Sequence, residues 1–237
     1  LYNVGFSSGI IATVIISVFK SFGLETESRL IWSTGNDRIF AVLLFVFFLL
    51  MIALGRFHSP TAFSQFRAIL KSSGLGGTDY VQEDGFSTAL VNMGINGIVA
   101  TAFVLLVGGD LNGPTIGGIF TVVGFGATGK HVRNILPVMM GVWLASLTKT
   151  WNITDPSPII TLLFSTTLAP IAGEFGVIAG IIAGFLHSSV AMNVGIIYGG
   201  MNLYNNGFAG GIVAAFMVSI IQSIEDRKAR AKGTMPL

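Results

Sequence analysis

Eight apolar stretches, separated by short polar segments, account for most of this 237-residue chain. They cover residues 4–22, 39–55, 86–107, 116–127, 135–147, 159–172, 175–192 and 208–224. The stretches are long and nearly uncharged and lack the one-sided stripe of an amphipathic helix, so the expected solvent is lipid. The pattern predicts an all-α, polytopic transmembrane helix bundle. Residues 116–127 are too few for a standard span, which predicts broken or re-entrant helices as well.

The polar segments indicate where the chain leaves the membrane. Residues 56–84 carry charged side chains, and residues 61–71 within them predict a short interfacial helix. Residues 225–237 form a charged tail that is expected to lie in water. Nine of the thirteen Lys and Arg residues fall on the side of this tail, whether residues 116–127 cross the membrane or turn back. The positive-inside rule therefore predicts a cytoplasmic C-terminus.

The beginning of the chain recurs near its end. The sequence LYNVGFSSGIIA at residues 1–12 corresponds to LYNNGFAGGIVA at residues 203–214, without a gap and at an offset of 202 residues. This match predicts an internal duplication, which in membrane proteins is typical of transporters and channels. Residues 1–22 would be the final helix of an upstream repeat, residues 23–224 one nearly complete repeat, and residues 225–237 the cytoplasmic tail. The rest of the N-terminal repeat is then expected upstream in the same protein.

The relative direction of the two copies depends on residues 116–127. If this stretch crosses the membrane, six spans separate the copies and they are inverted. If it turns back, five spans separate them and the copies are parallel. Inverted repeats are the favoured interpretation, because they commonly underlie alternating access, and the parallel arrangement stays open.

Composition agrees with a membrane protein and excludes other classes. The mean hydropathy is +0.77 and only 10% of the residues are charged, far below the quarter that is typical of soluble domains. A net charge of +2 gives no basic surface, so nucleic-acid binding is not expected. Gly176, Gly180, Gly184 and Ser188 recur every fourth residue and predict a face for close helix packing, within the protein or in a homo-oligomer.

Two polar segments inside this apolar chain are candidates for a binding site. Residues 108–115 and 193–207 combine glycines with neutral polar side chains, and irregular backbone at membrane depth requires protein or water around it. Their amide, hydroxyl and carbonyl groups suit a small polar solute or a dehydrated monovalent cation. Ordinary turns outside the membrane are the alternative interpretation. The candidate substrate-binding residues are Asp110, Asn112, Thr115, Asn193, Asn202, Tyr204 and Asn205, with Tyr2 and Asn3 as the earlier copies of the last two.

His187 lies within the apolar stretch 175–192 and completes the candidate site. A histidine inside a membrane is a functional hypothesis, here as a proton relay or as a hydrogen-bond donor to the solute. A structural histidine that bonds a facing carbonyl is an equally good interpretation. Asn92 and Asn96 share one side of a helix and could line a polar path or bond a neighbouring helix.

No enzyme signature accompanies these residues. The three histidines lack the spacing of metal ligands, and the apolar stretches hold no paired carboxylates or Ser/His/Asp arrangement. No catalytic residue, metal or cofactor is therefore predicted. The predicted function is a transporter or channel for a small polar solute or monovalent ion, and the alternative is a non-transporting membrane scaffold or a subunit of a larger complex.

Two sequence resemblances bear on this prediction. Residues 111–118, 121–127 and 130–131 (LNGPTIGG, TVVGFGA and KH), together with 200–211 (GMNLYNNGFAGG), resemble a family of duplicated bacterial inner-membrane proteins that is known only as a domain of unknown function. This resemblance implies a multi-pass protein of the bacterial inner membrane and no particular activity. Residues 203–208 (LYNNGF) are also similar to a motif that begins a membrane helix in urea transporters, which implies an analogy of fold and no substrate.

Overall fold

The computed structural model describes residues 4–24, 30–76, 78–197 and 205–231, and every regular element in these ranges is a helix. Six helical segments are long and apolar enough to cross a membrane. They are α1 (Val4–Ser21), α2 (Asp37–His58), α5 (Phe86–Leu106), the segment Pro156–Phe175, the segment Val177–Ile196, and α11 (Asn205–Ala231). The chain is therefore an all-α protein with the helices of a multi-pass membrane protein.

Two of the six long segments are interrupted by tighter turns. The segment Pro156–Phe175 consists of α8 (Pro156–Phe164), the 3₁₀ turn η2 (Ser165–Leu168) and α9 (Ala169–Phe175). The segment Val177–Ile196 consists of α10 (Val177–Asn193) and η3 (Val194–Ile196). Gly176 separates the two segments with a φ of 90°, a conformation that suits glycine and that ends α9. The predicted stretch 175–192 therefore begins with a break, because Gly176 joins two helices instead of lying inside one.

Shorter helices complete the fold. The predicted interfacial helix is α3 (Ala62–Ile69), and α4 (Tyr80–Glu83) follows it. The short apolar stretch 116–127 lies within α6 (Gly113–Gly124) and η1 (Phe125–Ala127), and α7 (Val132–Ser146) comes next. All eight predicted apolar stretches are thus helical, and the charged tail continues α11 as far as Ala231 with exposed side chains at residues 225–228.

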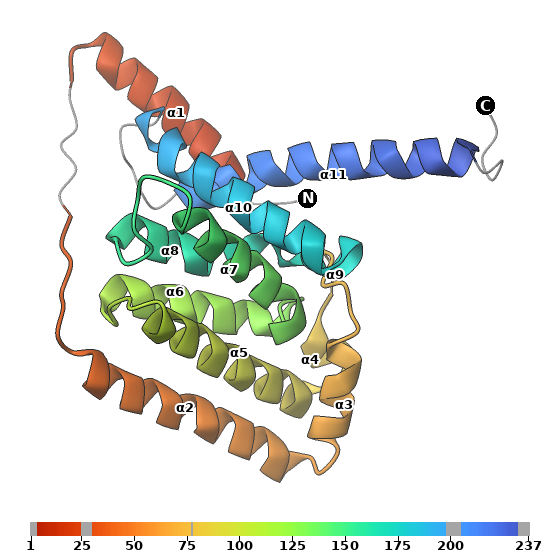
Figure 1. The fold of residues 1–237 in the computed structure, drawn as a ribbon. Coiled ribbons are helices and arrows are strands. Elements are labelled where there is room, and N and C mark those ends of the chain that lie inside the picture. Colours follow the sequence, from red (N-terminus) through yellow and green to blue (C-terminus); the bar gives the residue numbers. More distant parts are fainter. Residues whose placement is uncertain (1–3, 25–29, 77, 198–204, 232–237) are drawn as a thin grey trace.

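The helices are arranged in layers. In Figure 1, α2, α5, α6 and then α7 with α8 follow one another, and α10, α1 and α11 lie beyond them, while α3 and α4 cover one end. Phe48 of α2, Ile119 of α6 and Leu163 of α8 meet in the main core. On its outer side α2 exposes a continuous set of large apolar side chains, among them Ile39, Leu43, Leu50 and Leu54. Such a face is stable only against lipid or another apolar surface.

The predicted small-residue face packs α10 against α7. A Cβ atom on Gly184 would fall on the carbonyl oxygen of Val138, and one on Gly141 of α7 would fall on that of Ile181. Gly180 and Ser188 are buried on the same side of α10, which confirms these members of the predicted face. The small residues therefore let the backbones of α10 and α7 approach each other closely.

Hydrogen bonds to the turn between α6 and α7 explain why the apolar stretch 116–127 is shorter than a standard span. The side-chain amide of Asn92 donates to the carbonyl oxygens of Gly126 (2.6 Å) and Lys130 (2.8 Å), and that of Asn96 donates to Lys130 (3.0 Å). The turn after η1 is thereby held beside α5, six to ten residues beyond Phe86, and α7 leads back. Asn92 and Asn96 bond a neighbouring element, as one of their two predicted roles required.

Candidate functional site

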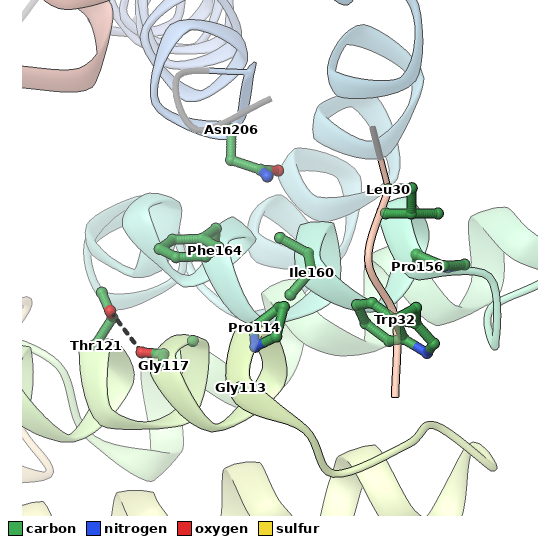
Figure 2. Close-up of a pocket in the computed structure, with 11 residues that line it drawn as sticks. Leu30, Trp32, Gly113, Pro114, Gly117, Thr121, Pro156, Ile160, Phe164 and Asn206 are labelled. Atoms are coloured by element: carbon green, nitrogen blue, oxygen red, sulfur yellow. Dashed lines mark hydrogen bonds between the residues drawn. The ribbon is translucent and has the colours of Figure 1, made fainter. Parts of the chain in front are cut away.

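A cavity of about 430 Å³ lies where α6, α8 and α11 begin. Figure 2 shows Asn206 on one side of it and Pro114 with Gly117 on the other. The first turns of α6 and α8 carry Pro114 and Pro156, whose fixed φ and missing N–H suit a helix start. The lining residues are Leu30, Trp32, Gly113, Pro114, Gly117, Gly118, Thr121, Pro156, Ile160, Phe164 and Asn206.

The start of α6 is fixed by Asn112 and Thr115. The side-chain oxygen of Asn112 accepts from the Thr115 N–H (3.2 Å), and the Thr115 hydroxyl accepts from the Asn112 N–H (2.8 Å). This reciprocal capping box satisfies two N–H groups that the helix cannot pair by itself. The Asn112 amide also donates to the carbonyl of Ser33 (2.9 Å). Both predicted site residues are buried in this arrangement and do not line the cavity.

Asp110 does not line the cavity, but it holds Trp32, which does. Its carboxylate accepts a hydrogen bond of 2.8 Å from the indole N–H of Trp32, and Trp32 lines the cavity. The neighbouring N–H of Leu111 donates to Asp37 at the beginning of α2 (2.6 Å). The polar groups of residues 110–115 therefore hold the segment before α2 against α6, and Asp110 acts on the cavity through Trp32.

The opposite side of the cavity is formed by Asn206 and supported by His187. Nε2 of His187 lies 3.2 Å from the side-chain oxygen of Asn206, and both residues are buried. His187 is the eleventh residue of α10, so α11 begins well inside the body of the protein. Among the described residues, no group bonds the other ring nitrogen, Nδ1, of His187. Within the described part of the chain, the ring is thus held by the single hydrogen bond through Nε2, and Nδ1 has no partner.

The remaining candidates lie elsewhere. Asn193 is exposed, and its amide donates to the carbonyl of Ser189 (2.7 Å) near the end of α10. Asn205 is half-buried at the start of α11, next to Gly195, and does not line the cavity. Four predicted residues lie outside the described residues, namely Tyr2, Asn3, Asn202 and Tyr204.

The two predicted polar segments therefore meet at one cavity, but through other residues. From the first segment, Gly113 and Pro114 line the cavity, and from the second segment Asn206 does. Apolar walls at Trp32 and Phe164 complete the cavity, and neither residue carries a local sequence signal that distinguishes it from the many other aromatic residues of the chain.

A second polar cluster lies at the other end of α6. Lys130 is almost completely buried, and its ammonium nitrogen donates to the hydroxyl of Thr166 (2.9 Å) and lies 4.7 Å from the ring centre of Phe125. Burial lowers the pKa of Lys130 to about 7. His131 approaches the carbonyl of Ser72 through Nε2 (2.9 Å), and the described residues contain no group of His, Cys, Asp and Glu that could hold a metal ion.

The family described as "Protein of unknown function (DUF1576)" matches residues 58–223. The chain belongs to this family. The DUF1576 region begins at the last residue of α2 and reaches into α11, so it includes the starts of α6, α8 and α11 at the cavity. Comparison with curated proteins and with solved structures finds no match. The predicted resemblance to a family of unknown function is thus confirmed, and the similarity to urea transporters stays a prediction.

Proposed function

We propose that this DUF1576 protein is a membrane transporter or channel and that its cavity holds a small, neutral, polar solute. The observation that carries the proposal is the cavity between two helix starts, those of α6 and α11, inside a protein with six membrane-length helices. In secondary transporters, helices that begin within the membrane supply binding groups from their free backbone ends.

The depth of the helix starts supports a site within the protein. α11 begins level with the middle of α10, where Asn206 meets His187. The backbone ahead of a helix start has polar groups that lipid cannot satisfy, and such a backbone is stable at membrane depth only inside protein or beside water. An ordinary turn outside the membrane would not bring Asn206 next to a buried histidine.

The lining favours a neutral solute over an ion. Among the described residues, no side chain that lines the cavity is charged, and Trp32, Ile160 and Phe164 give it apolar walls. The polar side-chain groups of its described lining residues are the hydroxyl of Thr121, the amide of Asn206 and the indole N–H of Trp32, which already donates to Asp110. Binding sites of this kind enclose the apolar part of a ligand and orient it with a few polar groups. His187 then acts as a positioning residue for Asn206, and its role as a proton relay stays a prediction.

The arrangement of charges supports a cytoplasmic C-terminus. The tip of the α6–α7 hairpin, with Lys130 and Arg133, lies against residues 70–74 after α3, at the end of the molecule where α2 finishes. The second half of α11 runs toward the same end, because Ile220 and Ile221 line one groove with Phe175 and Ile178. Within the described residues, this end then carries eight basic residues, namely Arg56, Arg67, Lys71, Lys130, Arg133, Arg227, Lys228 and Arg230. The positive-inside rule assigns such an end to the cytoplasm, in a bacterial inner membrane by resemblance.

Cysteine accessibility tests whether the cavity is wet. The chain contains no cysteine, so single cysteines can be read without background. In liposomes, Thr121→Cys should react with the membrane-impermeant cation methanethiosulfonate ethyltrimethylammonium. Two control variants should stay unmodified, Ile119→Cys in the core of α6 and Leu50→Cys on the lipid-facing side of α2. Protection of Thr121→Cys to the level of Ile119→Cys would favour the scaffold interpretation instead.

Flux tests the activity itself. Liposomes that contain the protein should shrink and recover after osmotic shock with at least one of urea, glycerol and acetamide faster than empty liposomes. Modification of Thr121→Cys should remove the difference, because the added group occupies the cavity, while the reagent should leave the Ile119→Cys protein unaffected. Flux that is insensitive to modification at Thr121 would place the pathway elsewhere.

A further inference from the structure

The two copies of the repeated sequence meet each other in the structure. Gly5 of α1 and Gly207 of α11 are 202 residues apart, and a Cβ atom on Gly207 would lie 2.5 Å from Cα of Gly5. The equivalent rings of Phe6 and Phe208 stack with 5.5 Å between their centres and 15° between their planes. Equivalent residues of the two helices therefore touch each other at the centre of the crossing.

The contacts on either side of this centre are reciprocal. A Cβ atom on Gly9 would lie 2.8 Å from the side chain of Phe208, and one on Gly211 would run into the ring of Phe6. Gly9 and Gly211 are again 202 residues apart. When residue i contacts residue j′ and residue i′ contacts residue j, a two-fold axis relates the two partners. The axis here passes between Gly5 and Gly207.

The direction of the two helices places this axis in the membrane plane. α1 lies along the C-terminal part of α10, where Ala12 and Ile16 pack with Ala191 and Val194. α11 runs in the opposite sense, toward the end where α10 begins, as Figure 1 also shows. Two repeats that a two-fold axis in this orientation relates are inverted repeats.

One stripe of these equivalent helices has different surroundings in the two copies. On α11 the stripe is buried, and Val213 and Met217 pack with Val138 of α7 and with residues of η2, α9 and α10. The matching stripe on α1 is bare: Ile11 is 59% exposed and Val213 2%, and Ile15 is 46% exposed and Met217 6%. The stripe consists of residues 206, 209, 213 and 217 on α11 and of residues 4, 7, 11 and 15 on α1.

We propose that the stripe Val4, Ser7, Ile11 and Ile15 of α1 is the docking surface for a second unit built like α7–α10. This unit is encoded upstream of α1 in the same polypeptide and packs on α1 as α10 and η2 pack on α11. The stripe adjoins the α1–α11 contact, so the second unit extends an interface that already exists and follows its two-fold axis. Docking of this unit is a matter of assembly and does not depend on the solute.

Oxygen accessibility of a nitroxide label tests this docking surface. Val14 is the matched control, because it is 59% exposed, as Ile11 is, while its counterpart Phe216 is still 58% exposed on the assembled side. In the protein as its gene encodes it, in liposomes, a label at Ile11→Cys should have several-fold lower oxygen accessibility than one at Val14→Cys. In the 237-residue chain alone the two labels should be equally accessible.

A nitroxide label at residue 11 adds bulk to the docking surface, so alanine variants without a label provide a second test. Ile11→Ala should lower the unfolding temperature of the gene-encoded protein more than Val14→Ala, and the two variants should be equal in the 237-residue chain. Equal accessibility and equal stability in the gene-encoded protein would overturn the proposal, and so would a gene product that begins at α1. Shielding of Ile11 in the 237-residue chain that grows with the protein-to-lipid ratio would assign the stripe to a second copy, which also contradicts it.

Discussion

The two ends of α6 present polar groups in opposite ways. At its C-terminal end, Asn92 and Asn96 bond the carbonyls of the turn, and Lys130 is enclosed by Thr166 and Phe125. At its N-terminal end, the capping groups are equally well bonded, but Gly113, Pro114 and Gly117 face open space. In this protein, therefore, polar residues in an apolar segment mark a candidate site at the N-terminal end of α6, where a cavity adjoins them, and a structural contact at its C-terminal end.

We call the C-terminal end of α6, with its hairpin turn, the closed end and the N-terminal end, beside the cavity, the open end. Substitutions at the closed end should lower the stability most, and Gly74 should show the largest effect. Its φ is +72°, and a Cβ atom there would strike the carbonyl oxygen of Gly129 in the hairpin turn. Gly74→Ala should therefore lower the free energy of unfolding by about 2–4 kcal/mol, since it adds backbone strain to a backbone contact. The unfolding temperature of the purified protein in detergent measures this.

Gly76→Ala is the matched control for Gly74→Ala. Gly76 lies two residues further along, and a Cβ atom there meets nothing within 4 Å. This variant should be as stable as the unmodified protein. Equal stability of the two variants would mean that residues 72–74 do not pack against the hairpin turn.

The amide bonds of the closed end should come next. Asn92→Ala removes two hydrogen bonds and leaves the buried carbonyl of Gly126 without this donor, which should destabilise the protein by about 2–3 kcal/mol. Asn96→Ala removes one bond to Lys130, whose carbonyl still accepts from Asn92, so its effect should be smaller. Denaturation curves of the two variants should keep this order, and the reverse order would contradict the geometry of the turn.

Lys130 should make the stability of the closed end depend on pH. Burial lowers its pKa from 10.5 to about 7, so between these values the unfolded chain binds a proton that the folded protein does not. Stability should therefore rise with pH over this range, by up to about 1.4 kcal/mol per pH unit, and fall as the pH is lowered toward 7. Lys130→Met should flatten the curve between pH 7.5 and 9.5.

Lys71→Met provides the reference for this pH experiment, because Lys71 is exposed at the same end of the molecule. It should keep the slope of the unmodified protein. A slope that Lys130→Met leaves unchanged would mean that another group is responsible.

The smallest effect is expected at the open end. A Cβ atom on Gly117 meets nothing within 4 Å, whereas one on the adjacent Gly118 would lie 2.8 Å from the side chain of Leu163. Gly117→Ala should change the stability by less than about 1 kcal/mol and can even increase it, because alanine favours a helix. Gly118→Ala should be the less stable of the pair. Equal losses in thermal stability would show that the space beside Gly117 is filled.

Local sequence was sufficient for the helices but not for the site. The eight helical stretches are predictable from the sequence because the hydropathy of a stretch depends only on consecutive residues. The break at Gly176 was missed, because a glycine inside an apolar run is equally compatible with a packed helix and with a break. Asn112 and Thr115 were expected at the site, but their spacing of three residues also suits a capping box, which is the role that the structure shows.

The cavity depended on contacts that no local pattern contains. Trp32 reaches α6 through Asp110, which is 78 residues away, and Asn206 reaches His187 across the start of a separate helix. The amino-acid sequence by itself determined a helical membrane protein with a repeated terminal motif, since burial in lipid requires only long apolar runs. Tertiary structure alone decided which of its polar groups bond one another and which border open space, because each group pairs with whatever element the fold places opposite it.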